Sequence, residues 1–270
     1  MADWIINDHQ TLSDGGTHTY NVVYIYDASI SGEVLATGDG STTHFEGNLA
    51  NNALQPNSLT VHYTIGGTAY EATDDGNGNI SGDYCSGTID YNTGAYTLDF
   101  TTAPDSGTDI TADYTSDAKL TIQNATTLQC DKLHVGSDGS THTYGGELVV
   151  RDTSQIVFND VSGCGMWVRQ NAVLDIQGTD ENNRVVIKSV GEPPSNRPTV
   201  YFLAATGNGS GTVYVKNCEV RYCGKVGIYN SGWYSNASFK VDNLKINNNS
   251  GYFYIYNFGS KTYDPELSPS

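Results

Sequence analysis

Two neighbouring stretches decide the fold: VYVKNCEVRYCGKVGIYNSG (213–232) and FKVDNLKINNNSGYFYIYNFG (239–259). Apolar residues alternate with polar ones in both, which indicates strands with one buried face. An Asn at a strand corner can hydrogen-bond its equivalent in the next layer, and such ladders stabilise stacked strands. The candidates for such a ladder are Asn217, Asn243, Asn230 and Asn257.

Short runs of the same kind recur through the second half of the chain, with Asn, Gly, Ser and Asp in the gaps. They are Leu120/Ile122, Leu133/Val135, Leu148/Val150, Ile156/Phe158, Val168, Leu174/Ile176, Val185/Ile187, Val200/Phe202, Val213/Val215, Val220, Ile228, Phe239/Val241, Leu244/Ile246 and Phe253/Ile255. No segment shows a sustained helical period, so the chain is predicted to be all-β. Close spacing without helices excludes βαβ units. A β-sandwich and a parallel β-helix remain as alternatives.

The two stretches quoted first resemble turns of right-handed parallel β-helix proteins, with the form V-x-N-[CL]-x-[VI]-x-x-[CN]-x-G-x-x-I-x-N. The resemblance favours the β-helix over the sandwich for this part of the chain. At about 20–24 residues a turn, it implies roughly seven or eight turns.

A near-repeat links the two halves of the sequence. SDGGTHTY (13–20) and SDGSTHTY (137–144) are each followed by an apolar strand and a polar stop, VYIYDAS (23–29) and LVVRDTS (148–154). Removing residues 33–116 would leave the two motifs about two turns of a solenoid apart. We therefore expect a first β-helix part over 1–32, an inserted β-sandwich module over 33–116, the β-helix body over 117–260 and a polar tail over 261–270.

The stretch 37–114 has glycine-containing turns between short runs rich in Thr, Val, Ile and Tyr, which is typical of a small antiparallel β-module. It contains TGDGSTTHFEG (37–47), PNSLTV (56–61), DDGNGN (74–79), GTIDYNTGA (87–95) and TAPDSGT (102–108). These segments, in this order, resemble a module of tailed-bacteriophage tail, baseplate and fibre proteins. The resemblance implies a virion part and assigns no chemistry.

Charge and composition exclude several classes of function. With 13 Lys and Arg and a net charge of −17, the chain lacks the basic footprint of a nucleic-acid-binding protein. The start MADWIINDHQ is not a secretory signal, and no apolar run is long enough to span a membrane. We expect assembly in the host cytoplasm and a final place on the virion surface.

The sequence offers no convincing catalytic or metal centre. Cys85, Cys130, Cys164, Cys218 and Cys223 are predicted to be buried free thiols. The loop Asp74–Asn79 has calcium-like spacing at Asp75, Asn77 and Asn79, but Ile80 and Ser86 break the pattern, so a hairpin turn is favoured. His18 and His142 are interpreted as turn residues. The carboxylates are interpreted as salt-bridged or solvated residues: Asp152, Asp160, Asp175 and Glu219.

Aromatic residues near the C-terminus are the predicted binding residues. Tyr252, Tyr254 and Tyr256 alternate on one side of YFYIY, and Trp233 and Tyr234 occupy a turn. Exposed Tyr and Trp favour sugar stacking or protein interfaces. Aromatic stacking between successive turns is the structural alternative.

These observations predict a non-enzymatic surface structural protein of a phage-like virion, either a tail fibre or spike component or a capsid decoration, with a role in host attachment. The expected partners are other virion proteins, further copies of the chain and a host surface glycan, without nucleic acid, membrane insertion or cofactor. A glycan-binding or depolymerising spike and a self-assembling cell-surface filament or layer protein are the alternatives.

Overall fold

The computed structural model describes residues 1–137, 139, 145–169, 171–191, 194–205, 211–230, 238–247 and 253–257. Contacts divide the chain into two compact units. One contains Met1–Ile6, Gln10–Tyr26 and the chain from Lys119 onward, and the other contains Asn7–His9 and Asp27–Ala118. We call them the parallel unit and the antiparallel unit. The antiparallel unit includes all of the predicted module 33–116.

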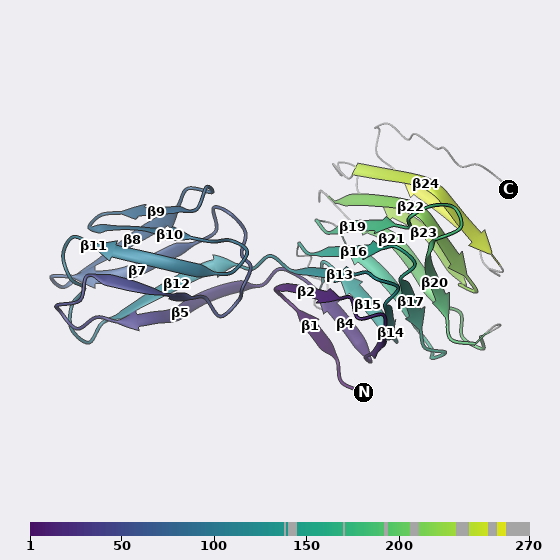
Figure 1. Cartoon of the computed structure of the whole chain (residues 1–270), viewed down its shortest axis with the longest axis horizontal. Coiled ribbons are helices and arrows are strands. Elements are labelled where there is room, and N and C mark those ends of the chain that lie inside the picture. Colours follow the sequence, from purple (N-terminus) through teal and green to yellow (C-terminus); the bar gives the residue numbers. More distant parts are fainter. Residues whose placement is uncertain are drawn as a thin grey trace. The chain divides into compact units, whose positions relative to one another are not determined.

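The parallel unit begins with a seven-stranded sheet in which neighbouring strands are parallel (Figure 1). Its strands, in order across the sheet, are β1 (Trp4–Ile6), β4 (Val22–Ile25), β15 (Lys132–Val135), β18 (Gly165–Arg169), β21 (Thr199–Ala205), β23 (Lys225–Asn230) and β25 (Phe253–Asn257).

Ten further strands of this unit form a second sheet, whose path folds back at β22 (Thr212–Arg221). One arm contains β2 (His9–Leu12), β13 (Lys119–Ile122), β16 (Glu147–Arg151) and β19 (Val173–Gln177). The other contains β20 (Val185–Ser189), β17 (Gln155–Phe158), β14 (Thr127–Cys130) and β3 (Thr17–Thr19). The first half of β22 pairs with β19 and its second half with β20, and β24 (Ser238–Asn247) pairs along both halves.

The chain visits the sheets in a regular cycle of one strand in the seven-stranded sheet and then one in each arm of the second sheet. Strands β15, β16 and β17 make one such cycle, and β18, β19 and β20 pair with them in parallel, strand for strand. Every predicted alternating run lies on a strand. Their inward members are buried from β13 to β22, as Leu133, Leu148 and Ile156 illustrate, and half-buried in β24 where side chains are described. The periodicity predictions for the second half of the chain are therefore confirmed.

The antiparallel unit is one continuous eight-stranded sheet. Its order is β5 (Ser29–Thr37), β12 (Asp109–Thr115), β7 (Thr60–Ile65), β8 (Thr68–Asp74), β9 (Asn79–Gly82), β10 (Cys85–Ile89), β11 (Ala95–Phe100) and β6 (His44–Asn48). The sequence predicted a sandwich of two sheets here, but hydrogen bonds connect all eight strands in a single path. Apolar alternation predicts that each strand has a buried face, but it does not reveal which strands pair.

The sheet curls around one apolar core. Tyr63, Leu98 and Phe100 are buried in it, with the Tyr63 and Phe100 rings in edge-to-face contact at 5.0 Å. Hydrogen bonds link the end strand β5 to Tyr96 of β11 and to the chain just after β6. The Tyr96 hydroxyl donates to the Leu35 carbonyl at 3.3 Å, and the Ala50 amide donates to a Glu33 carboxylate oxygen at 2.7 Å.

The chain enters and leaves the antiparallel unit at one place. Ala28 and Ser116 exchange two hydrogen bonds of 2.8 Å, one between the Ser116 amide and the Ala28 carbonyl and one from the Ala28 amide to the Ser116 hydroxyl. The buried Asp27 carboxylate accepts from the Ala118 amide at 2.8 Å and from the Gln55 side chain at 2.6 Å. The two ends of the insertion are therefore fastened to each other.

The near-repeat SDG[GS]THTY does not mark equivalent turns. Its first copy (13–20) follows β2, in the second sheet, and runs into β3, whereas its second copy begins after β15, in the seven-stranded sheet. The two copies are therefore not two whole turns apart, because turns of similar sequence can connect strands at different points of the cycle, although the inserted module inferred with them agrees with the two units. Within the residues that the structure describes, no helix has the length and apolar character needed to cross a membrane.

Candidate functional site

The predicted aromatic residues fall largely outside the described part of the chain. Trp233, Tyr234 and Tyr252 lie in undescribed segments. Tyr254 and Tyr256 belong to β25 by their backbone, where they pair in register with Gly227 and Tyr229 of β23. Their side chains are not described, so the proposal that they bind a partner stays a prediction.

A row of aromatic residues, which we call the aromatic row, crosses the seven-stranded sheet at one register position: Tyr24, His134, Trp167 and Tyr201. The Tyr24 and His134 rings stack with centroids 5.3 Å apart and planes 13° apart. The His134 and Trp167 rings stack at 5.1 Å and 14°. The same register position continues through Gly227 to Tyr254. A predicted binding residue therefore shares its register position with this row.

The aromatic row contains a neutral histidine. Burial, together with the nearby cations Arg169 and Lys132, lowers the pKa of His134 to about 4. The His134 Nδ1 atom is buried and has no hydrogen-bond partner among the described residues. A neutral imidazole can stack between Tyr24 and Trp167 without the cost of burying a charge. This stacking between successive strands is the structural alternative that the sequence offered for YFYIY, found at an earlier part of the same sheet.

Sequence reasoning missed the aromatic row, although a signal was present. An aromatic ring stands between two apolar residues in VYI (23–25), LHV (133–135), MWV (166–168) and VYF (200–202). The apolar neighbours point into the core, so the residue between them must face outward. Recognising the row requires that these four tripeptides be aligned with each other, and the wide separation of the first from the second hides that alignment.

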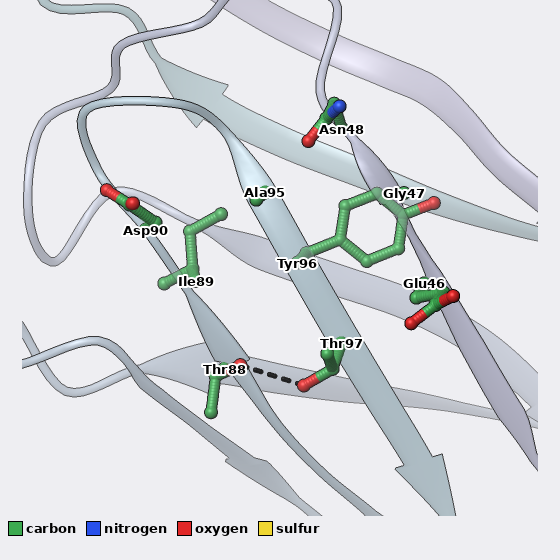
Figure 2. Close-up of a pocket in the computed structure, with 9 residues that line it drawn as sticks. All are labelled: Glu46, Gly47, Asn48, Thr88, Ile89, Asp90, Ala95, Tyr96 and Thr97. Atoms are coloured by element: carbon green, nitrogen blue, oxygen red, sulfur yellow. Dashed lines mark hydrogen bonds between the residues drawn. The ribbon is translucent and has the colours of Figure 1, made fainter.

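The antiparallel unit carries an open groove of about 590 Å³ at one end of its sheet. It crosses β10, β11 and β6, and Figure 2 shows its nine lining residues. Of its apolar lining residues only Ala95 is exposed, whereas Ile89 and Tyr96 belong to the core of the unit, and Glu46 and Asp90 lie on opposite sides of them. Thr88 and Thr97 are engaged with each other through a hydroxyl hydrogen bond of 2.8 Å.

The Tyr96 ring packs closely against Gly47 of β6. A Cβ atom on Gly47 would approach the Tyr96 hydroxyl to 2.8 Å, so no larger residue fits there without moving that ring. Tyr96 is itself held by its hydrogen bond to the Leu35 carbonyl. Ala95, which neighbours Tyr96 on β11, is exposed.

The antiparallel unit is acidic throughout. Of the 30 Asp and Glu residues in the chain, 14 lie within 27–118, and none of the 13 Lys and Arg residues does. This range therefore carries a formal charge of −14, and the rest of the chain, with 16 acids and 13 bases, carries −3.

Many of the unit's carboxylates are used in internal hydrogen bonds. Asp74 accepts from the Asn57 and Leu59 amides and from the Tyr91 hydroxyl, at 2.7, 2.8 and 2.7 Å. Asp105 accepts from the Gly66 and Gly67 amides. Within the described residues, Glu46 has a single ion pair, with the His44 ring at 3.8 Å.

The four carboxylates considered for catalysis each have structural partners. Asp175 binds Arg151, and Glu219 binds Arg221 at 2.6 Å, so the predicted salt bridges are confirmed for both. Glu219 is buried, not solvated. Asp160 accepts from the Ser195 and Asn196 amides, which lower the pKa of its carboxyl. Asp152 accepts from the Asn124 amide at 3.3 Å.

The calcium-like loop is a hairpin turn between β8 and β9, as predicted. The Asp75 carboxylate accepts from the Asn79 side chain at 2.8 Å and from the Asn77 amide at 2.8 Å, and these bonds lower the pKa of its carboxyl. His18 was interpreted as a turn residue, but it lies on strand β3, where its ring contacts the Asp14 carboxylate at 3.0 Å; His142 is outside the described residues. The described part of the chain contains no group of three His, Cys, Asp or Glu residues that could hold a metal ion.

The cysteines are buried free thiols, as predicted. Burial raises the pKa of Cys85 and of Cys223 to about 12, so these thiols stay protonated and unreactive at neutral pH.

Comparison with known proteins identifies no family. No family model matches the sequence, and no curated protein matches it. A solved structure found by the structural comparison is described as the Gp54 tailspike of Acinetobacter baumannii bacteriophage AP22 in complex with A. baumannii capsular saccharide. The match covers 92% of this chain and 62% of the tailspike, with 9% identity and a TM-score of 0.14. At these values the similarity supports no conclusion about fold or function.

Proposed function

We propose that this protein is a non-enzymatic structural protein on the surface of a phage-like virion, as a tail fibre or spike component or a capsid decoration. The parallel unit would be a short right-handed parallel β-helix that serves as a rigid post, and the antiparallel unit would be a docking module. The observation that carries the proposal is the strand-for-strand parallel pairing of successive three-strand cycles, from β1 to β25.

Three further observations support this role. The motifs in 37–114 resemble a module of tailed-phage virion proteins, and those residues fold within a unit of their own. The carboxylates considered for catalysis are tied to structural partners. The five thiols are buried, which suits a part without redox chemistry.

The direct test is to look for the protein in particles. Antibodies raised against the purified chain should label intact virions of the virus that encodes it, and the protein should sediment with them at a fixed copy number. The purified chain should release no reducing sugar or unsaturated product from host capsule or cell-wall polysaccharide. Absence from the particle would refute the structural role, and cleavage lost on Asp160→Ala or Asp175→Ala would establish a depolymerase.

Glycan binding is the second candidate, favoured by the aromatic row. Its stacked rings are half-buried along one face of the seven-stranded sheet, and Lys132 and Arg169 lie near His134. Aromatic side chains with polar neighbours are suited to partly apolar, partly polar ligands. Binding of host polysaccharide that is lost on Trp167→Ala, with folding intact by circular dichroism, would favour this function over a purely structural one.

A further inference from the structure

Asn77 lies in the turn between β8 and β9 and is followed by a glycine. We infer that Asn77 is a site of spontaneous deamidation, and that the Tyr91 hydroxyl sets the rate by holding the backbone nitrogen that attacks it. The chain contains one other Asn–Gly pair, Asn208–Gly209, which lies outside the described residues. The inference is independent of whether the protein belongs to a virion.

The reaction takes place between two neighbouring residues. The backbone nitrogen of Gly78 gives its proton to water and forms a bond to the side-chain carbonyl carbon of Asn77. The bond from that carbon to the side-chain nitrogen breaks, and ammonia leaves. Water then opens the cyclic imide at either carbonyl carbon, which leaves aspartate or isoaspartate at position 77. Glycine hinders this attack least because it has no Cβ atom, and water reaches Asn77 because its side chain is exposed.

The fold requires the glycine of this pair. Gly78 has a left-handed backbone with φ of 92°, and a Cβ atom on it would approach the Ile89 carbonyl oxygen to 3.0 Å. The Gly78 carbonyl also accepts a hydrogen bond from the Ile89 amide at 2.9 Å. The reactive pair therefore cannot be removed at position 78 without straining the turn against β10.

The Tyr91 hydroxyl holds the attacking nitrogen. The Gly78 amide donates to this hydroxyl at 3.1 Å, and the hydroxyl donates in turn to the Asp74 carboxylate at 2.7 Å. Burial and the Asp74 carboxylate raise the pKa of Tyr91, so the hydroxyl keeps the proton that it donates. Asp74 is itself buried and accepts two backbone amides. The Gly78 nitrogen must therefore leave a firmly held acceptor before it can reach the Asn77 side chain.

Conversion would change the turn chemically. The Asp75 carboxylate accepts from the Asn77 amide and from the Asn79 side chain, both at 2.8 Å. A new carboxylate at position 77 would repel Asp75 and add one negative charge to residues 27–118, which already carry −14. Isoaspartate would also lengthen the backbone of the turn by one carbon. Both products are therefore expected to loosen the hairpin of β8 and β9.

The test compares the full chain, its Tyr91→Phe variant and a synthetic peptide of residues 71–82 in mildly alkaline buffer. Peptide mapping by mass spectrometry measures conversion at position 77 separately from conversion at position 208. Asn77 should convert more slowly in the full chain than in the peptide. It should convert about fivefold faster in Tyr91→Phe than in the wild-type chain, which is the factor that one ordinary hydrogen bond supplies. Equal rates in the wild type and either comparison, or no conversion in wild type and variant, would overturn the inference.

The chain supplies a matched control variant. The Tyr114 hydroxyl, like that of Tyr91, donates to a carboxylate, here Glu33 at 2.6 Å, and accepts from a backbone amide, that of Asn51 at 3.3 Å. Tyr114→Phe removes this hydroxyl from the same unit and leaves the hydrogen bonds of the turn in place, so it should leave the conversion of Asn77 unchanged. Equal acceleration in both variants would indicate a general loosening of the unit and would refute the role of Tyr91.

Hydrogen exchange keeps the test decisive if Tyr91→Phe disturbs the turn. The Ile89 amide, which donates to the Gly78 carbonyl, reports whether the turn remains fastened to β10. Faster conversion with unchanged protection of this amide would assign the effect to the freed Gly78 nitrogen. Faster conversion with loss of that protection would show that the turn had opened, and would contradict a direct role of Tyr91.

Discussion

Single residues hold the corners of the parallel unit, and Asn217 and Asn243 show how. The Asn243 side chain donates to the Asn217 side-chain oxygen at 2.8 Å, and the Asn217 side chain donates to the Gly178 carbonyl at 3.2 Å. Both asparagines have a left-handed backbone, with φ of 48° and 55°. Arg184 closes the ladder by donating to the carbonyl and the side-chain oxygen of Asn243, both at 2.8 Å. The Asn ladder predicted from the sequence is confirmed for this pair.

Substitutions at Asn217 should separate backbone conformation from hydrogen bonding. Asn217→Gly keeps the left-handed backbone and loses the amide, at a cost of about 1–3 kcal/mol for the bonds left unmade. Asn217→Ala loses the amide, and holding alanine in the left-handed backbone conformation costs about 1–2 kcal/mol more. Urea unfolding followed by tryptophan fluorescence should therefore rank wild type above Gly and Gly above Ala. Equal stability of the two variants would mean that the backbone at this corner relaxes freely.

Asp27 should make stability depend on pH. Burial raises its pKa to about 6, above the ordinary value of 3.8. Between these values the folded chain keeps a proton that the unfolded chain has released, so the contribution of Asp27 to stability is full below about pH 4 and is lost as pH rises to about 6. Asp27→Asn mimics the protonated form at every pH, and the Gln55 amide can flip to meet it. The variant should melt higher than wild type at pH 7.5 and equally at pH 4.

Asp75→Asn is the control for this experiment. Hydrogen bonds from Asn79 and Asn77 lower the pKa of Asp75, so its contribution is present at neutral pH and lost on acidification, the opposite sign to Asp27. At pH 7.5 the wild type should melt at a higher temperature than Asp75→Asn and at a lower temperature than Asp27→Asn. The same sign for both would contradict the assignment of Asp27.

At the scale of the strand, the sequence predicts which residues face the core, but it does not predict which residues on the opposite face are also covered. The sequence predicts that only one of Val149 and Val150 in β16 points inward, and both are buried, at 5% and 0% exposure. Val150 lies in register between the core residues Ile122 and Ile176, whereas Val149 lies between Thr121 and Asp175 on the opposite face. The prediction that only one valine points inward is therefore confirmed, and Val149 is buried because residues on the outer face cover an apolar side chain there as well.

Lysine at these two positions should still have unequal effects. Val150→Lys places an ammonium in the core, which costs several kcal/mol when the charge is unpaired. Val149→Lys can extend its charge to solvent beside Asp175, so its cost should be about 1 kcal/mol or less. Thermal unfolding by circular dichroism measures the difference. Similar, large losses in both variants would show that the outer face at β16 is as tightly packed as the core.

The sequence also predicted elements better than their pairing. Strands such as those at Leu133/Val135 and Leu174/Ile176 could be predicted because a strand with one buried face has an apolar residue at every second position. The pairing of all eight strands in one sheet of the antiparallel unit depends on contacts such as that of Thr97 with Glu46. These residues are distant in sequence, and no local sequence pattern indicates that they pair. The candidate sites depended on the same information. Neither the aromatic row nor the groove can be seen until separate strands are aligned.

At the scale of the whole molecule, the antiparallel unit should be removable. Because Ala28 and Ser116 are joined by two hydrogen bonds, replacing 27–118 by a short Gly–Ser linker demands little rearrangement of the strands on either side. All three tryptophans, Trp4, Trp167 and Trp233, lie outside 27–118, so their fluorescence reports on the parallel unit alone. The shortened chain should unfold cooperatively by this signal, with a midpoint within about 5 °C of the full chain.

The isolated fragment 27–118 tests whether the antiparallel unit also folds on its own. It should give an antiparallel-sheet circular dichroism spectrum and its own unfolding transition. Aggregation of the shortened chain, or loss of its cooperative transition, would show that the parallel unit needs the insertion in order to fold.

The joined ends of the antiparallel unit also bear on the order in which the chain folds during synthesis. Strand β4 leaves the ribosome well before its partner β15, because the 92 residues of 27–118 must be translated between them. At roughly 5–20 residues a second this takes several seconds, long enough for the antiparallel unit to fold first. Its folding brings Ala28 next to Ser116 and converts a 92-residue loop into a short one, which lowers the entropic cost of closing the first cycle by roughly 2–3 kcal/mol. The inserted unit thus acts on the nascent chain as an internal folding aid for the strands that flank it.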